Sequence, residues 1–400
     1  MKRGRTRGAP GITLVEMLVV LAILSVLLGL GAMSFFRASQ KYKEEAAVGA
    51  VETALRTARN EALTQRAPAF VELDHKREIP RVTPWSYKLE GLWHFEEGSY
   101  QSNGAFGIAA MLQGCKLGEG KIGKGLQLFN AGPRGATLGY ADCGENPAWD
   151  CENGGYLEAY VFGMQPFGGG QYVFFKRNCY SLSIGRGGVL TGAVGSTEVR
   201  AENFAIPMAR WTKVALAWDR LSTRVLVDDA ILAVGPGAET PRAQEPLLIG
   251  NENGSLNGII DEVRVFSALR GKPVSLGDAK LQHDAQPWDA VFFAPDGSLD
   301  VRYHAGPITL RVIRERKVRP IFISMFGLMQ RKAQEKIEPE DEAPAESAKT
   351  AAPAERPPLL PPKRKTGTIK TLPTSEEKTP GEAKTAEPEG PMNEPADARD

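Results

Sequence analysis

Residues 11–36 read GITLVEMLVVLAILSVLLGLGAMSFF, and this stretch decides how the chain begins its fold. From Ile12 to Phe36 nearly every residue is apolar, and about 20 such residues are enough for a helix that crosses a bilayer. Basic residues precede the stretch and hold the N-terminus in the cytoplasm by the positive-inside rule. They are Lys2, Arg3, Arg5 and Arg7. The sequence therefore predicts a single-pass anchor in the inner membrane.

Two residues distinguish this anchor from an ordinary secretory signal. Gly11 lies between the basic leader and the apolar run, whereas a secretory cleavage site follows the apolar core. Glu16 lies inside the run, where an unpaired carboxylate costs up to about 2.5–3.5 kcal/mol. Cleavage after Gly11 would leave a charged amine on Ile12, four residues from Glu16. That pairing is poor within one chain and natural between neighbouring helices.

The run Gly11–Glu16, with the sequence GITLVE, closely resembles the signature of type IV prepilins. The resemblance implies that a prepilin peptidase cuts between Gly11 and Ile12 and methylates the new amine of Ile12. It also implies that Glu16 pairs with the N-terminus of another pilin or pseudopilin during assembly. Ile12 departs from the usual phenylalanine. The alternative is a plain signal anchor with an accidental glutamate.

The helix is expected to continue beyond the membrane to residue 66. Apolar residues recur there at three- and four-residue spacing, which predicts an amphipathic face that packs against a globular head. They are Val48, Val51, Leu55, Ala58 and Ala62. Pro68 then ends the helix.

Two distant segments resemble the head of the H-type minor pseudopilins of type II secretion. Residues 54–73 show the Ala-Arg-x-Glu-Ala helix end of that family, then a proline and a first strand. The Phe-x-Pro-x-Gly turn of its closing strands appears much later, at Phe293–Gly297. Alternating runs at Ile308–Ile313 and Pro320–Ser324 predict strands. The head is therefore expected to be split by an inserted domain.

Between Leu89 and Arg270 the sequence changes to frequent glycines and short β-rich runs separated by turn residues. This pattern is typical of an antiparallel sandwich. The expected strands are Gly125–Asn130, Gly155–Phe162, Val173–Phe175, Ser181–Ile184, Trp211–Asp219, Thr223–Val227, Pro246–Ile249 and Gly258–Phe266.

Five segments of this region resemble, in order, the concanavalin A-like, laminin-G-type jelly roll. They are Leu92–Gly98, Gly123–Phe129, Trp211–Ala215, Leu226–Asp228 and Asn257–Phe266. The resemblance implies a domain that binds glycans or proteins and often calcium, with Asp261 as a candidate ligand. The alternative is that Asp261 is buried and accepts hydrogen bonds from loop amides. Asn130 removes a usual carboxylate, and the sequence has no Asp-rich loop to supply the six to eight oxygens of calcium.

Jelly rolls of this kind also include glycosidases, whose retaining mechanism needs two carboxylates about 5–5.5 Å apart. The usual Glu-x-Asp-x-x-Glu run does not occur in residues 89–270. Asp261 and Glu262 are adjacent, and on a regular strand they would face opposite ways. The histidines fall in different segments and suggest no metal or triad set. They are His75, His94, His283 and His304. The sequence therefore favours a protein that is not an enzyme.

The cysteines lie between the N-terminal helix and the C-terminal tail, and none has the short spacing of a zinc pair. Beyond the membrane two disulfides are expected, with three connectivities open. We favour Cys143–Cys151, because a short loop closes easily, which leaves Cys115–Cys179. The alternative is buried free thiols.

Residues 331–400 have no aromatic residues and are rich in Pro, Glu, Lys, Ala and Thr, so they are expected to be disordered. Arg356–Lys365 resembles a polyproline ligand with a basic end, and a solvated spacer is the stronger alternative. The formal net charge is +1, and loss of the four leader charges would leave −3. Nothing in this balance points to nucleic acid.

Together these features predict an α+β protein in six segments. They are a leader (1–11), a transmembrane and assembly helix (12–66), a pilin-type head in two parts (67–88 and 271–330), a jelly roll (89–270) and the tail (331–400). The predicted function is a minor pilin or pseudopilin, of a type IV pilus or a type II secretion pseudopilus, that displays a binding domain in the periplasm or on a surface filament. The alternative is a membrane-tethered adhesin or carbohydrate-binding protein outside any filament. Calcium is the one candidate cofactor.

Overall fold

The computed structural model describes residues 14–96, 109–129, 139–164, 167, 169–254, 256–285, 287–333 and 335–336. The predicted cleavage and methylation site, Gly11 and Ile12, lies outside the described residues. So do Asn130 and nearly all of the predicted tail, including Arg356–Lys365.

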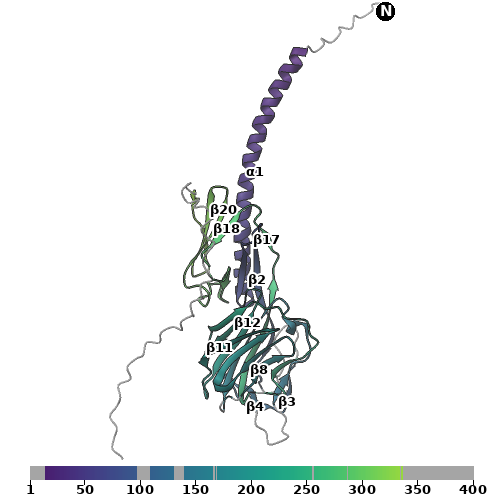
Figure 1. Ribbon diagram of the computed structural model, residues 1–400, viewed down its shortest axis with the longest axis vertical. Coiled ribbons are helices and arrows are strands. Elements are labelled where there is room, and N and C mark those ends of the chain that lie inside the picture. Colours follow the sequence, from purple (N-terminus) through teal and green to yellow (C-terminus); the bar gives the residue numbers. More distant parts are fainter. Residues whose placement is uncertain are drawn as a thin grey trace, which may run out of the picture. The chain divides into compact units, whose positions relative to one another are not determined.

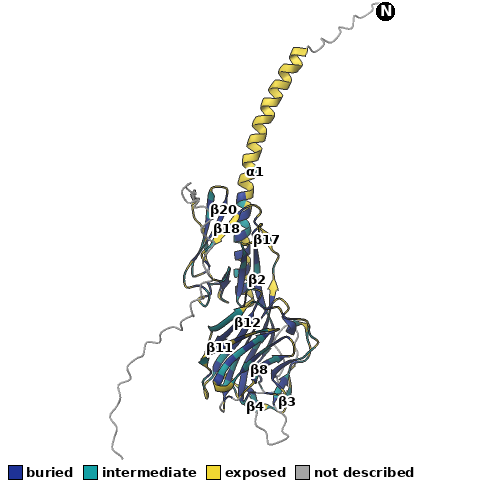
Figure 2. Ribbon diagram, in the orientation of Figure 1, coloured by how far each residue is buried: buried dark blue, intermediate teal, exposed yellow. Residues whose placement is uncertain are grey.

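A single long helix, α1 (Leu14–Gln65), opens the described part of the chain. Its N-terminal half is apolar, exposed throughout, and long enough to cross a membrane. Its C-terminal half is buried along one face from Glu44 onward, including all five residues of the predicted apolar stripe. Figure 2 shows the change from exposed to buried where α1 reaches the strands. The predicted amphipathic helix is therefore confirmed.

The head packs two sheets against the buried half of α1 (Figure 1). One contains β1 (Ala69–Asp74), β2 (Arg81–Trp93), β17 (Val274–Ser275) and β19 (Ala290–Phe293). The other contains β18 (Lys280–His283), β20 (Ile308–Arg314), β21 (Lys317–Ile323), β22 (Met329–Arg331) and β23 (Glu335–Lys336). Both predicted closing strands are present, as β20 and β21. The predicted tail starts too early, because β23 pairs with β21.

The inserted region is an antiparallel sandwich, as predicted. Its first sheet holds β4 (Lys116–Glu119), β5 (Lys124–Leu128), β7 (Gly155–Gly163), β12 (Thr212–Trp218), β13 (Ser222–Val227), β14 (Ala230–Pro236) and β16 (Gly258–Arg270). Its second sheet holds β3 (Met111–Gln113), β6 (Tyr140–Asp142), β8 (Gln171–Lys176), β9 (Tyr180–Ile184), β10 (Val189–Val194), β11 (Thr197–Ala205) and β15 (Leu247–Gly250). Two short 3-10 helices, η1 (Pro147–Asp150) and η2 (Arg186–Gly188), join strands. Buried Trp93, Trp149 and Trp218 lie in the core between the sheets.

The head and the sandwich share one eleven-stranded sheet. The first part of β2 pairs with β1, from Arg81 to Ser86. Its last part, from Trp85 to Trp93, pairs with the end of β16. The chain thus enters the sandwich on β2 and leaves it on β16, and these two strands are hydrogen-bonded to each other. The inserted domain is a continuation of the head sheet, and residue 88, the predicted end of the first head segment, lies inside β2.

A separate hydrophobic core covers the junction between the two parts. Phe70 of β1 stacks on Trp85 of β2, with ring centroids 5.6 Å apart, and on Phe292 of β19 at 5.1 Å. From the sandwich, Tyr156 and Phe266 join the same cluster. This core fixes the sandwich to the head through side chains as well as through the sheet.

Candidate functional site

Glu16 lies in the first turn of α1, among exposed apolar side chains such as Leu14 and Leu18. A carboxylate in the first turn interacts favourably with the positive end of the helix dipole. The exposed apolar half of the helix offers lipid or another helix a uniform surface, and Glu16 is its charged residue near the N-terminus. This geometry suits packing between copies of such helices.

Asp261 is fully buried, and both of its carboxylate oxygens accept backbone hydrogen bonds. Oδ2 accepts from Lys121 N at 2.8 Å and Ile122 N at 3.0 Å, and Oδ1 accepts from Glu262 N at 2.7 Å. Burial raises the pKa of Asp261, against the effect of these amides. These contacts agree with the alternative to a calcium ligand, in which the buried Asp261 accepts hydrogen bonds from loop amides.

Glu262 departs from the regular strand that the sequence suggested. A bulge interrupts the β16–β7 pairing at this point, and Glu262 has a φ of 50°. Asp261 and Glu262 are both buried, and the regular alternation that the sequence suggested is interrupted between them. Glu262 binds His94 Nδ1 at 2.5 Å and Arg264 at 3.2 Å. Its carboxylate is engaged in ion pairing that holds the bulge.

Three half-exposed aromatic residues form a platform on the outer face of the second sheet. They are Tyr140, Tyr172 and Phe175, which we call the aromatic platform. A bulge in β8 leaves Tyr172 and Phe175 on the same side, with ring centroids 5.1 Å apart, while Val173 and Phe174 point into the core. Tyr140 lies two strands away on β6, across β15.

Polar groups surround the aromatic platform. Ser181 and Ser183 of β9 lie opposite Phe175 and Tyr172 in the register. Arg177 and Glu252 form an exposed ion pair of 3.3 Å at the edge, and both line a shallow depression with Tyr140 and Phe175. Aromatic faces combined with a few polar groups are typical of sites that bind small ligands. The sequence indicated strands here but not this platform, because the β8 bulge that brings the two rings together, edge to face at 68°, has no clear sequence signal.

All four cysteines are free thiols in this structure, so neither Cys143–Cys151 nor Cys115–Cys179 is bonded. The thiols point to different carbonyl groups: Cys115 Sγ lies 3.2 Å from Tyr140 O, and Cys179 Sγ lies 3.4 Å from Pro241 O. Burial raises the pKa of all four thiols. This arrangement agrees with the alternative interpretation of free thiols and not with the two expected disulfides.

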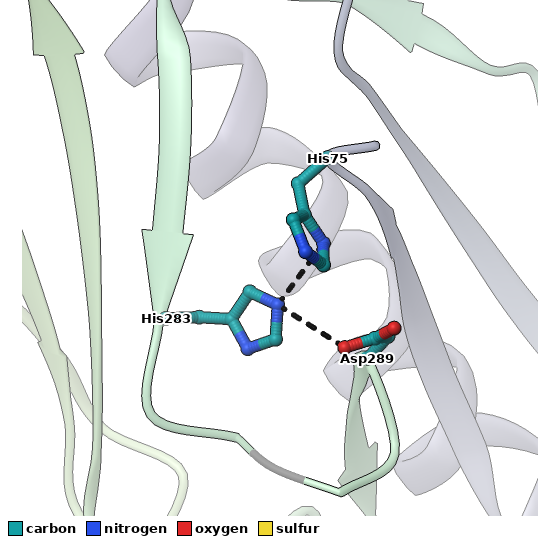
Figure 3. Close-up of side chains that lie close together, drawn as sticks. All are labelled: His75, His283 and Asp289. Atoms are coloured by element: carbon teal, nitrogen blue, oxygen red, sulfur yellow. Dashed lines mark hydrogen bonds and ion pairs between the residues drawn. The ribbon is translucent and has the colours of Figure 1, made fainter. Parts of the chain in front are cut away.

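The histidines are not all separate, contrary to the sequence interpretation. His75 and His283 come together in the head, beside Asp289, and their rings meet edge to face with centroids 4.8 Å apart (Figure 3). His94 and His304 lie elsewhere, with Glu262 and Phe292 as partners. The sequence missed the pair because His75 precedes the insertion and His283 follows it. The prediction that the two head segments form one domain could have suggested that His75 and His283 lie close together.

The N-terminal segment matches a known family. The family described as the prokaryotic N-terminal methylation motif covers residues 7–32, which include Gly11, Ile12 and Glu16. The match ends within the exposed apolar half of α1. The N-terminal segment of this chain is that of a type IV prepilin-like protein. The prepilin-like protein is accordingly membrane-anchored through a single N-terminal helix.

Other comparisons used the full sequence and the structure. A search of curated proteins gives no match. Among solved structures, the chain is similar to domain 4 of AbnA, a GH43 extracellular arabinanase from Geobacillus stearothermophilus, in complex with arabinotriose. The two share 18% sequence identity with a TM-score of 0.38, and the match covers 46% of this chain and 95% of that chain. It is also similar to the binding domain of botulinum neurotoxin DC in complex with rat synaptotagmin II: 7% identity, TM-score 0.37, covering 58% and 73%. These low values support no inference about a ligand or an activity.

Proposed function

We propose that this prepilin-like protein is a non-enzymatic minor pilin or pseudopilin that assembles into a type IV pilus or a type II secretion pseudopilus. The observation that carries the proposal is the division of α1 into two halves. The first half is exposed and apolar with Glu16 near its start, and the second half is buried under the head from Glu44 onward. A helix of this kind has one surface for its own head and one for lipid or for other helices.

Assembly gives Glu16 a role that anchoring alone does not. A carboxylate in a membrane span is costly, and such groups usually mark functional contacts. Cleavage after Gly11 would place a new amine on Ile12, and in a filament the amine of one subunit can pair with Glu16 of the next. A simple anchor would work as well with an apolar residue at this position.

Replacement of Glu16 tests assembly against simple tethering. We expect Glu16→Ala to enter the membrane normally but to be lost from filaments, measured by fractionation and by cross-linking to other pilins. Ser25→Ala, in the same exposed segment, is the matched control and should assemble normally. Equal incorporation of both variants would instead support the alternative, a tethered adhesin or carbohydrate-binding protein.

For the displayed sandwich we propose glycan binding at the aromatic platform. The platform combines two adjacent aromatic rings with serine hydroxyls and an exposed ion pair, and a sugar ring needs both apolar faces and hydrogen-bond partners. The periplasm or a surface filament, where we place the globular part, would give the platform access to cell-wall or surface glycans.

A glycan array with the purified protein tests this second step. We expect Tyr172→Ala and Phe175→Ala to weaken binding at least tenfold, since each removes one of the stacking faces. Tyr160→Ala, a half-exposed tyrosine on β7 of the other sheet, is the control and should bind normally. Binding that is unaffected by the platform variants would place the ligand elsewhere, and release of shortened glycans would indicate a hydrolase.

The buried carboxylates of the sandwich support a non-enzymatic role. Glu158 contacts Arg264 at 3.1 Å and Lys213 at 3.3 Å. Asp150 contacts Lys176 at 3.2 Å, within the buried interior. Carboxylates held in this way stabilise the fold, whereas a retaining glycosidase needs two that reach the substrate.

A further inference from the structure

His75, His283 and Asp289 converge from three separate elements of the head (Figure 3). His75 directly follows β1, His283 ends β18, and Asp289 directly precedes β19. β1 and β19 belong to one sheet of the head and β18 to the other. His75 comes before the inserted sandwich in the chain, and the other two residues come after it. The cluster therefore joins both sheets and both chain segments of the split head.

The distances in this cluster are close to those between the ligands of a tetrahedral metal ion. His75 Nδ1 lies 3.3 Å from His283 Nε2, which lies 3.6 Å from Asp289 Oδ1. All three ligand atoms lie within 4.8 Å of one another. Atoms bound to zinc at about 2.0–2.1 Å in tetrahedral geometry are roughly 3.4 Å apart. A small inward shift of the carboxylate would place all three atoms around one ion.

No neutral arrangement of protons turns all three polar contacts around the two histidines into hydrogen bonds. His75 Nδ1 also lies 3.2 Å from Leu73 O, an acceptor, so this contact requires a proton on Nδ1. If that proton is present, His283 Nε2 must accept from it, and its lone pair then faces the carboxylate of Asp289. If His283 Nε2 carries the proton instead, His75 Nδ1 is bare and its lone pair faces Leu73 O. If both nitrogens carry a proton, Leu73 O and Asp289 each accept one, and two donors then face each other across the 3.3 Å contact between the rings. Each neutral arrangement therefore leaves one of the three contacts without a hydrogen bond.

A cation can take the lone pairs of His75, His283 and Asp289 together, and His75 Nδ1 then gives up its proton and with it the hydrogen bond to Leu73 O. Imidazole nitrogens with one carboxylate suit zinc and its neighbours in the first transition series better than calcium or magnesium. The other oxygen of Asp289 is held by Lys76 Nζ at 2.7 Å, and a hydrogen-bonded carboxylate is usual for a ligand. Lys76 is well exposed, so its charge is largely solvated beside the ion.

The cluster is also open to entry of an ion. The His283 side chain is 2% exposed, whereas the Asp289 side chain is 23% exposed. His75 and Asp289 both line an open surface depression, together with Asp74. Water can supply a fourth ligand from this side.

We propose that His75, His283 and Asp289 bind a divalent transition-metal ion of the zinc class, which clips together the two segments of the head. The ion ties the end of β1 to the ends of β18 and β19, the region where the insertion has separated the head in sequence. This site differs in place and in ligand chemistry from the calcium site predicted at Asp261.

Metal binding to the full-length protein in detergent, first stripped with a chelator, tests the proposal. We expect one equivalent of Zn²⁺ to bind at micromolar or lower concentration, and Co²⁺ to give the visible spectrum of a tetrahedral nitrogen and oxygen site. His75→Gln and Asp289→Asn should each weaken binding at least tenfold. His94→Gln, a histidine of the sandwich, is the matched control and should bind normally.

Thermal unfolding provides a second readout and checks that the variants fold. With Zn²⁺ at a hundredfold excess over Kd, the Tm of the wild-type protein should rise by about 5 °C or more, and that of His75→Gln should not. No binding at micromolar Zn²⁺ would overturn the proposal. So would equal affinity of His75→Gln, or a Co²⁺ spectrum with thiolate charge-transfer bands, which would place the ion at cysteines.

Discussion

Arg224 of β13 offers the sharpest test that the sandwich and the head form one cooperative unit. Its side chain is 1% exposed, and so is that of its ion-pair partner, Asp219. The guanidinium also donates to Tyr303 Oη at 3.1 Å and lies 5.6 Å from the ring centroid of Phe292. Tyr303 and Phe292 belong to the head segment that follows the insertion. Arg224 therefore connects the sandwich to the head from a buried position.

The expected cost of Arg224→Met follows from these contacts. Asp219 keeps the backbone donors Leu221 N and Ser222 N but loses its buried cation. Removing one partner of a buried pair typically costs about 3–5 kcal/mol. Loss of the contacts with aromatic rings adds up to about 1–2 kcal/mol. Arg224 Nε has no hydrogen-bond partner, which lowers the stabilisation that the arginine provides. We therefore expect a loss near the lower end of the summed range, about 4 kcal/mol.

Urea unfolding of a fragment that begins at residue 38, followed by fluorescence and circular dichroism, measures this loss. The double variant Arg224→Met/Asp219→Asn removes both charges and keeps an acceptor for the two amides, so it should recover about 2 kcal/mol relative to the single variant. The two signals should give one shared transition. A loss below about 1 kcal/mol, or separate transitions for the sandwich and the head, would refute a cooperative junction.

Two further predictions concern the dependence of the free energy of unfolding on pH. Burial alone would raise the pKa of Glu44, but the hydrogen bonds and charges of Arg319 and Lys317 outweigh burial and lower this pKa. The free energy of unfolding should therefore decrease as the pH falls below about 4.5. Glu44→Gln should lose less stability than the wild type during acid denaturation. An unchanged loss of stability in acid would contradict the ion pairs of Glu44 with Arg319 and Lys317. Burial lowers the pKa of His304 to about 4, so stability should fall by at most about 3 kcal/mol as the pH drops from 6.5 to 4. His304→Gln, which retains an acceptor for Phe292 N, should flatten urea-derived stability over that interval, and an equal slope would refute the assignment.

Local sequence patterns were sufficient to predict most elements. The three- and four-residue spacing of Val48, Val51 and Leu55 predicts burial on one face of the helix, and all three residues are buried. The eight expected strands of the sandwich are present with ends shifted by a few residues. Strands such as β10 and β14 were not predicted, because their small residues and glycines interrupt the alternation that marks a half-buried strand.

Features that depend on pairing across the insertion could not be predicted from local patterns. An arginine in the strand Ser222–Val227 suggests a solvent-facing position, and Arg224 is buried only because residues from the closing part of the head cover that face. The approach of His75 to His283 has the same origin. The bulge at Glu262 depends on the partners of Asp261, whose donors lie in a loop far away in sequence.

A chain that is processed as a prepilin and assembled through its N-terminal helix has a defined mature N-terminus at Ile12. Mass spectrometry of the N-terminal tryptic peptide, from protein isolated from cells with an active prepilin peptidase, tests it most directly. We expect a peptide that begins at Ile12, ends at Arg37 and carries one methyl group on its amine. Peptides from an intact leader, with Gly11 still joined to Ile12 and no methyl group, would contradict it.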